Sequence, residues 1–202
     1  FTALAIAEFD LRNVFTKEMQ DAAAAASLPE LGKREDLRAI PLVTIDGEDA
    51  KDFDDAVFAE PAPENCWRII VAIADVSTYV QSGDILDKEA RQRGNSVYLP
   101  GTVLPMLPEA LSNGLCSLRP HEDRACLAVE MIIDSAGKKQ SHKFFQALIR
   151  SSARLTYTLV QQVIEGSLDE ADCKVTPGTL HHLIGAFRTL HKSRNRRGTL
   201  NL

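Results

Sequence analysis

Residues 42–59 read LVTIDGEDAKDFDDAVFA, in which an acidic segment separates two short apolar runs. The runs at 42–45 and 56–59 contain β-branched and aromatic residues that favour strands, so the acidic segment is expected to join two strands. Residues 67–74 form a nearly continuous apolar run, which predicts a central strand covered on both faces. These three runs together indicate a domain built around a sheet.

Working outward from this stretch, the patterns alternate between strands and helices, and no internal repeat interrupts them. The combination predicts an α+β fold with a mixed, largely antiparallel sheet and flanking helices. Capping residues and apolar periodicity predict the remaining elements. Helices are expected at 17–26 after Thr16, at 84–93 between Asp84 and Gly94, at 108–114, from Thr158 to 164 and at 179–194, and strands at 125–134 and 141–150 around a turn at 136–137.

The composition is that of one ordinary globular domain, with 202 residues, 45% of them hydrophobic and 25% charged. No apolar run approaches the roughly 18 residues of a membrane span, and the N-terminus has no signal segment. The four cysteines lie far apart without a C-x-x-C pair, which predicts reduced thiols rather than a zinc site or a disulfide framework. We therefore expect a cytoplasmic protein that is monomeric and has no membrane contact.

The charges are segregated along the chain. Residues 46–55 hold six acids and one lysine, a local net charge of −5 that equals the net charge of the whole chain, so the remaining residues are balanced. Residues 188–197 hold five bases and no acid. Segregation of this kind predicts one site for a cation and another for an anion.

The acidic segment has the chemistry of a cation site. Crowded carboxylates repel each other unless a counter-charge is present, and Lys51 alone cannot neutralise six acids. Oxygen ligands suit Mg²⁺ and Ca²⁺, but an EF-hand counted from Asp46 would have Lys51 and Val57 in place of its glycine and glutamate. Phe53 inside the acid run suggests a segment pinned to a core. From spacing alone, a magnesium site for phosphoryl chemistry and a solvated acidic turn both stay open.

Several motifs, taken in order, resemble the catalytic (RNB) domain of the ribonuclease II/ribonuclease R family, and the ribonuclease R branch fits best. The signature spans residues 42–56, and the likeness covers nearly everything from Leu37 onward. It implies a helical or linker segment over 1–36 and the catalytic domain over 37–202. In the family this domain continues with more strands and a further active-site arginine, so the chain is expected to be C-terminally incomplete, and its start at Phe1 to be a fragment boundary. The other matching motifs are IADVS at 73–77, YLPG at 98–101, PMLP at 105–108, LS at 111–112, LCSL at 115–118, ARLTY at 153–157 and RRG at 196–198.

The resemblance implies an exoribonuclease that removes nucleoside 5′-monophosphates one at a time from the 3′ end of single-stranded RNA. Its cofactor would be Mg²⁺, or Mn²⁺, with two ions present when substrate is bound. By family pattern, Asp46 and Asp55 are direct metal ligands. Asp52 helps to hold the metal and its water, and Asp54 is the acid most needed for cleavage. Metal binding is thus assigned to all four aspartates and catalysis to Asp52 and Asp54.

Four residues are expected to contact RNA, and for Tyr98 the resemblance itself implies the contact. Tyr98 would stack on the terminal nucleotide, although a tyrosine at a strand end is also a common core residue. Arg154 would line the RNA channel or simply close a strand. Arg196 and Arg197, at the end of the basic run, would meet RNA phosphates or form a solvated cationic face.

Two other hypotheses stay open at this point. The chain could be an RNA-binding fragment of such an enzyme, inactive through truncation. It could also carry an acidic metal-buffer loop on an unrelated scaffold. Metal titration with single-stranded RNA separates the three, because only the enzyme releases nucleotides.

Overall fold

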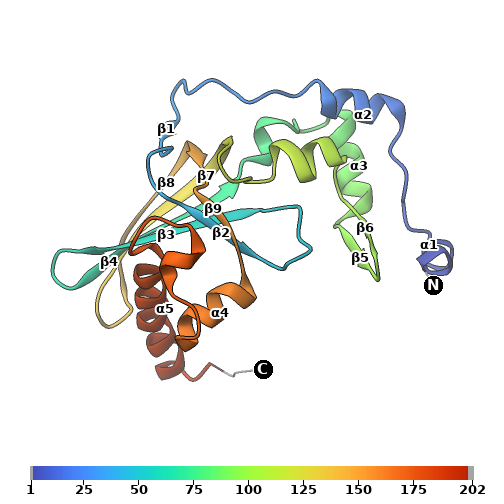
Figure 1. The fold of residues 1–202 in the computed structure, drawn as a ribbon. Helices are drawn as coiled ribbons and strands as arrows, with labels where there is room; N and C mark the ends of the chain where they lie inside the picture. Colours follow the sequence, from blue (N-terminus) through green and yellow to red (C-terminus); the bar gives the residue numbers. More distant parts are fainter. Residues whose placement is uncertain (1, 200–202) are drawn as a thin grey trace.

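The centre of the molecule is a seven-stranded sheet, and the structure, a computed structural model, describes residues 2–199. Its strands are β1 (Glu35–Asp36), β2 (Val43–Asp46), β3 (Asp55–Ala62), β4 (Cys66–Ala74), β7 (Asp123–Ile133), β8 (Lys139–Arg150) and β9 (Ala153–Thr156). They lie in the order β1-β8-β7-β4-β3-β2-β9. The pairs β1·β8 and β2·β9 are parallel and the others are antiparallel. The expected α+β fold with a largely antiparallel sheet is confirmed (Figure 1).

β4 is the middle strand, as the apolar run at 67–74 predicts, and it pairs with β3 and β7 along its length. Ile70 and Ala72 point into the core and are fully buried. On the opposite face the prediction of full cover is wrong at one end, because Ile73 is 46% exposed. Its cross-strand partner Leu127 is 48% exposed, so this corner of the sheet is open.

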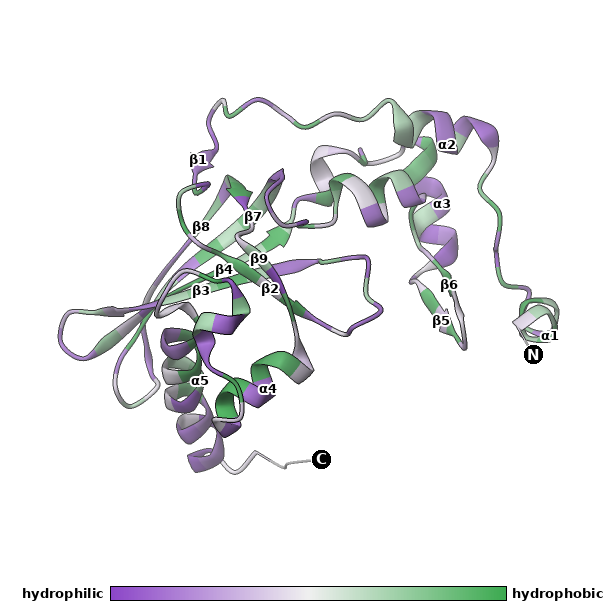
Figure 2. Cartoon of the chain, viewed as in Figure 1, coloured by the Kyte–Doolittle hydropathy of each residue, from purple (hydrophilic) through white to green (hydrophobic). Residues whose placement is uncertain are grey.

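Helices pack on both faces of the sheet. One face buries its residues against α2 (Lys17–Ala24), α3 (Ile85–Arg93) and the segment 105–118, in a cluster that includes Phe58, Cys126 and Ile149. The other face carries α4 (Tyr157–Glu165) and α5 (Thr179–Arg196), which bury the sheet beside β2, β3 and β9. Figure 1 shows α4 and α5 together on one side, and Figure 2 shows hydrophilic residues along much of α5.

The helix ends follow the capping residues of the sequence. The Oγ1 of Thr16 accepts a hydrogen bond from the Met19 amide at the start of α2, and Asp84 caps α3 in the same way through the Asp87 amide. The expected cap at Thr158 is wrong: Thr156 caps α4, with its Oγ1 accepting from the Leu159 amide. β9 runs directly into α4, so the last strand residue serves as the helix cap.

Helix α5 lies close to the sheet at two glycines. A Cβ on Gly185 would lie 2.7 Å from the Trp67 ring, and the Trp67 indole N–H donates to the Thr189 hydroxyl at 3.1 Å. Gly137, in the turn between β7 and β8, has a φ of +79°, and a Cβ there would lie 2.5 Å from the Ser193 side chain. Both contacts require glycine, and they fix the axis of α5 across the sheet.

Several short elements lie beyond the sequence predictions. These are β1, β9 and the hairpin of β5 (Val97–Leu99) and β6 (Thr102–Leu104), together with 3-10 turns at Val76–Thr78 and Glu170–Cys173, whereas α1 (Thr2–Glu8) lies in the segment expected to be helical or linker. The predicted helix at 108–114 is an irregular π-type turn over Leu111–Leu115, because Gly114 departs from helical geometry. Within residues 2–199, no helix combines the length and apolar character needed to cross a membrane.

The four cysteines are free thiols, as expected. Three of them are buried, and burial raises the pKa of Cys116 and of Cys126 to about 12. At neutral pH these groups are protonated and act as apolar core side chains.

Candidate active site

The four aspartates singled out by the sequence lie at the junction of β2 and β3. Asp46 is the last residue of β2, and Asp55 is the first residue of β3. Because these strands pair antiparallel, their ends meet, and the loop between them carries Asp52 and Asp54. Figure 2 shows a largely hydrophilic loop here. The prediction that the acidic segment joins two strands is confirmed.

The second half of this loop is fixed to the core through its backbone. Phe53 is 9% exposed, and its amide donates to the Ser117 Oγ at 3.1 Å. The same hydroxyl donates to the Lys51 carbonyl at 2.9 Å, and the Leu118 amide donates to the Phe53 carbonyl. The Asp54 carbonyl accepts from the Ala74 amide. Asp52 therefore lies between two residues that share one buried hydroxyl, so this loop is anchored rather than a free acidic turn.

The first half of the loop is held by Arg154. This residue lies on β9 beside Thr44 of β2. Its Nη2 donates to the carbonyls of Gly47 and Glu48, at 2.7 and 2.6 Å, and its guanidinium lies 5.6 Å from the centre of the Phe53 ring. In this structure Arg154 therefore holds the backbone of the acidic loop, and its role in RNA binding stays a prediction.

Electrostatics at the junction disfavour bare carboxylates. Burial, followed by the charge of Asp55, raises the pKa of Asp46, and Arg154 only partly opposes this. Desolvation together with Asp52 and Asp55 likewise raises the pKa of Asp54. The Oδ2 of Asp46 is buried and has no hydrogen-bond partner among residues 2–199. A buried acceptor of this kind is costly unless a proton or a cation satisfies it.

The donor set fits Mg²⁺ in chemistry but does not form a closed cage. All the candidate donors are carboxylate oxygens, which hard divalent cations prefer. Within residues 2–199, no three His, Cys, Asp or Glu side chains converge closely enough to hold a metal unaided. Mg²⁺ commonly uses few protein carboxylates and completes its shell with water and phosphate oxygens. The unpartnered Asp46 oxygen is the atom best placed to serve as such a ligand.

Tyr98 reaches the acidic loop from the β5–β6 hairpin. Its side chain is 66% exposed, and its hydroxyl donates to the Asp52 Oδ2 at 2.9 Å. This bond to the Asp52 carboxylate, followed by desolvation, raises the pKa of the Tyr98 phenol. An open aromatic ring beside the aspartates has the geometry of a stacking platform and not of a core residue.

Arg196 and Arg197 lie at the opposite end of the sheet. They end α5 beside the β7–β8 turn, where the Arg196 Nη2 donates to the Ala136 carbonyl at 3.4 Å. The aspartates lie where β3 begins, and there Asp55 pairs with Ile73 near the end of β4. The β7–β8 turn follows Ile133, which pairs with Trp67 near the start of β4, so the two sites lie at opposite ends of this strand. The structure therefore brings Tyr98 and Arg154 to the aspartates but not the two C-terminal arginines (Figure 1).

Two further groups support the loop, and sequence reasoning missed Ser117 and Arg34. One is Ser117, whose position in the LCSL motif was the only available signal. The other is a buried pair in which the Arg34 Nη2 donates to the Asp75 Oδ2 at 2.8 Å. Burial acts to raise the pKa of Asp75, but hydrogen bonds from Ser77, Arg34 and Thr78 outweigh it and lower the pKa. Asp75 directly follows β4, and the amide of Ala74, the last residue of β4, donates to the Asp54 carbonyl. The Arg34–Asp75 pair therefore fixes the end of the strand to which the acidic loop is bonded.

Comparisons with known proteins point to one family. A family model described as the RNB domain matches residues 34–202. Ribonuclease R of Vibrio cholerae is 50% identical over 186 residues, and that of Escherichia coli is 49% identical over 188 residues. In each case the match covers 91% of this chain and 23% of the relative, so the chain spans about a quarter of the length of these relatives.

A solved structure agrees with the sequence matches. The chain is similar to Mycoplasma genitalium RNase R in complex with ribose-methylated single-stranded RNA, with a TM-score of 0.89 and 29% identity. The match covers 97% of this chain and 31% of that one. Nearly all of the fold described above thus recurs in that protein.

Proposed function

Because this chain belongs to the RNB domain family, we propose that it is the part of a 3′-to-5′ exoribonuclease that carries the catalytic aspartates. The substrate is the 3′ end of single-stranded RNA, and the products are nucleoside 5′-monophosphates. The ribonuclease R relatives and the RNA-bound neighbour support this proposal. The single observation that carries it is the anchored group of four aspartates at the β2–β3 junction, with Tyr98 bonded to one of them.

The residues take distinct roles in this proposal. Asp46, Asp52, Asp54 and Asp55 would hold Mg²⁺ or Mn²⁺, which supplies an activated water and charge neutralisation at a phosphodiester. Asp54 has a raised pKa and lies near Asp52 and Asp55, so a bound cation would favour its ionised form. Tyr98 would stack on the terminal base and keep the 3′ end beside Asp52. Ser117 and Arg154 fix the loop backbone before substrate arrives, and such preorganisation lowers the barrier.

A second function is favoured by the structure of the site itself. The aspartates form no closed metal cage in residues 2–199, and Arg154 is already bonded to the loop. A chain in this state could bind RNA through Tyr98 and its surface cations without cleaving it. This alternative differs from the first in one respect, the release of nucleotides.

The experiment compares the chain with its Asp54→Asn variant on one single-stranded RNA labelled at the 5′ end, with Mg²⁺, Mn²⁺ or a chelator. We expect metal-dependent shortening from the 3′ end, release of 5′-monophosphates, and no release by the variant. Binding without release at any metal concentration would favour the RNA-binding alternative. The absence of both would contradict the two proposals together. A cytoplasmic location and a monomeric state stay predictions.

A further inference from the structure

The segment before the sheet folds back onto the hairpin that carries Tyr98. Residues 9–15 run along α3, and α2 also packs on that helix. Figure 1 shows this blue N-terminal part beside α3, β5 and β6. Nothing in the sequence motifs assigns it a role, yet several of its contacts are buried and charged.

Two buried charges on α3 hold this segment. Glu89 and Arg93 are only 3% and 4% exposed, and the Arg93 Nε donates to the Glu89 Oε1 at 2.9 Å. Arg12 approaches the same carboxylate with two donors, Nε at 2.9 Å and Nη2 at 2.7 Å. The hydrogen bond from Arg12, with help from Arg93, lowers the pKa of Glu89. Buried charges persist only when fully paired, so the N-terminal segment is part of their pairing.

Arg93 extends this network to the base of the hairpin. Its Nη1 donates to the Arg12 carbonyl at 2.6 Å and to the Pro105 carbonyl at 3.3 Å. Its Nη2 donates to the Val14 carbonyl at 2.9 Å, and its guanidinium lies 3.7 Å from the centre of the Phe15 ring. Pro105 follows β6 directly, and Arg93 ends α3 just before β5. One side chain thus joins the N-terminal segment to both ends of the hairpin.

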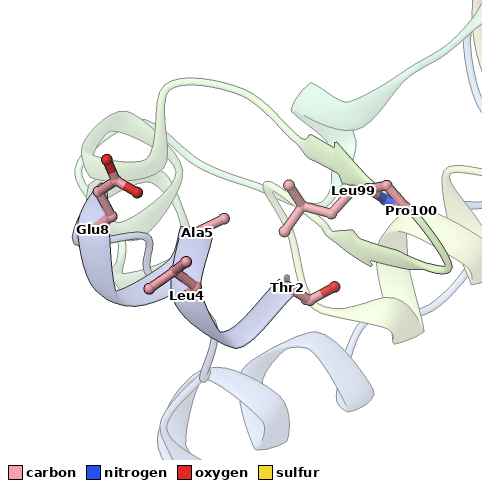
Figure 3. Close-up of a pocket in the computed structure, with 6 residues that line it drawn as sticks. All are labelled: Thr2, Leu4, Ala5, Glu8, Leu99 and Pro100. Atoms are coloured by element: carbon pink, nitrogen blue, oxygen red, sulfur yellow. The ribbon is translucent and has the colours of Figure 1, made fainter.

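The hairpin tip has a second contact with the N-terminal part. Thr2, Leu4 and Ala5 of α1 face Leu99 and Pro100 across a cavity of about 170 Å³ (Figure 3). A second cavity of about 220 Å³ lies at the hairpin base, between residues 9–12 and Val97 and Leu104. Leu99 is the neighbour of Tyr98, so the same segment borders the hairpin at its base and at its tip.

We propose that residues 2–15 form a clasp, closed by Arg12, Glu89 and Arg93, that positions Tyr98 over Asp52. Glu89 and Arg93 are positioning residues in this proposal, because neither touches the aspartates. The hairpin has only two short strands of its own, and an isolated two-stranded hairpin is marginally stable in water. The clasp supplies the support that the hairpin lacks. The stacking role of Tyr98 rests on the proposed function, but the clasp itself rests only on contacts of this chain.

The test uses the full chain with three variants. Arg12→Gln removes the half-exposed member of the network, and Glu89→Gln removes the shared carboxylate charge. Arg91→Gln is the matched control, because within the described part of the chain Arg91 pairs only with Asp87, on the exposed side of the same helix. Amide hydrogen exchange of residues 97–104 measures hairpin opening, with residues 66–74 of β4 as an internal reference.

We expect hairpin exchange about fivefold faster or more in Arg12→Gln and Glu89→Gln, with the β4 amides and the Arg91→Gln variant unchanged. Equal exchange in all four proteins would overturn the clasp. Faster exchange in the control as well would show general loosening of α3, which also overturns it. If Glu89→Gln fails to fold, Arg12→Gln decides the matter alone.

A second measurement connects the clasp to Tyr98. Ribose-methylated single-stranded RNA with a 3′-terminal 2-aminopurine reports stacking by fluorescence quenching. We expect Arg12→Gln and Glu89→Gln to lose part of the quenching, and to cause no further loss in a Tyr98→Ala background, because the two changes act through one contact. Additive losses would contradict the positioning role. If the parent shows no quenching, the proposed stacking fails while the exchange result still stands.

Discussion

The acidic loop at 46–55 and the basic helix end at 188–197 are equally conspicuous in the sequence, but the structure treats them differently. The loop is bonded at both halves, by Arg154 on one side and by Ser117 and Leu118 on the other. The helix end has exposed cations, and the contact of Arg196 with the β7–β8 turn is long, at 3.4 Å. The backbone of the acidic loop is thus held by hydrogen bonds, whereas the basic helix end is distinguished mainly by its charge.

This difference explains why counting charges along the sequence locates charged regions but does not show which of them is a binding site. A site requires side chains held in place before the ligand arrives, and the anchors are neutral or buried groups that a charge profile omits. Ser117 is an uncharged residue with no exposed surface, yet it fixes the backbone on both sides of Asp52. Up to Thr199, where the described residues end, the basic helix end has no comparable anchor, so we expect it to act through its electrostatic field rather than through geometry.

The sharpest test of the comparison is Asp54→Asn, with Asp49→Asn as the control because Asp49 is an exposed acid of the same loop. We expect nucleotide release to fall about 100-fold or more for Asp54→Asn, with RNA affinity retained. Asp49→Asn should behave like the parent, because it removes the same charge from an exposed residue of the same loop that is not among the proposed metal ligands. The measurement is the release rate and the dissociation constant on one oligonucleotide. Equal losses in the two variants would mean that charge, and not position, matters.

The same pair of variants has a stability readout. Because the pKa of Asp54 is raised in the folded state, its ionised form is less favourable there than in the unfolded chain. The free energy of unfolding of the parent should therefore rise as the pH falls towards the raised pKa of Asp54. Asp54→Asn should reduce this rise, and without metal it should be more stable than the parent at neutral pH. Thermal unfolding from pH 4 to 8, with and without Mg²⁺, checks the direction. A larger Mg²⁺ stabilisation of the variant than of the parent would contradict the metal assignment.

Removing an anchor should have the next largest effect. Ser117→Ala leaves the Phe53 amide and the Lys51 carbonyl without a partner, which costs about 1–3 kcal/mol of unfolding free energy. Ser112→Ala is the matched control, because among the residues that the structure describes its hydroxyl bonds only to the neighbouring Asn113 side chain. Urea unfolding and nucleotide release are measured on both. If Ser117→Ala unfolds and reacts like Ser112→Ala, the loop is held by something other than this hydroxyl.

Tyr98 variants separate stacking from the bond to Asp52. Tyr98→Ala should lose a stacking contact that contributes about 1–3 kcal/mol per base, so short products dissociate earlier and accumulate at greater lengths. Tyr98→Phe keeps the ring and removes only the hydroxyl, so it should leave product lengths near those of the parent. End-product lengths on a gel decide between them. An unchanged ladder for Tyr98→Ala would remove Tyr98 from the RNA contacts.

The smallest effect is expected at the helix end. The double variant Arg196→Gln/Arg197→Gln should weaken RNA binding modestly and lower the log–log salt slope by about 1.4, since each phosphate contact contributes roughly 0.7 for single strands. Stability should stay within about 0.5 kcal/mol of the parent's. Binding titrations between low and moderate salt measure the slope. An unchanged slope would identify this region as a solvated cationic face.

Sequence patterns predicted the long elements of the fold because their signals are local. The Asp84 and Gly94 caps bound α3, and the 125–134 and 141–150 runs appear as β7 and β8. The short strands β1 and β9 escaped prediction because their existence depends on parallel pairing with partners more than a hundred residues away. The cap of α4 is Thr156 rather than Thr158 for a related reason, because β9, which was not predicted, ends at Thr156 and the helix begins directly after it.

For the site, the sequence predicted the acids but not their supports. The aspartates and Tyr98 come together as the motifs implied. The role of Arg154 as a brace, and those of Ser117 and the Arg34–Asp75 pair, depend on contacts across 41 to 107 positions of the chain. Long-range contacts of this kind leave no periodic trace in the sequence. The distance between the basic helix end and the aspartates likewise follows from how α5 crosses the sheet.

The parallel pairing of β2 with β9 also has a consequence for the order in which the molecule assembles. The brace from Arg154 to Gly47 closes a loop of 107 positions, and such closure is slow because its entropy is lost before the contact is gained. During synthesis the acidic loop therefore emerges long before its brace, with its carboxylates repelling one another in open solvent. We therefore expect the proposed metal site to form late in folding, after the strand at 153–156 has emerged and paired with β2.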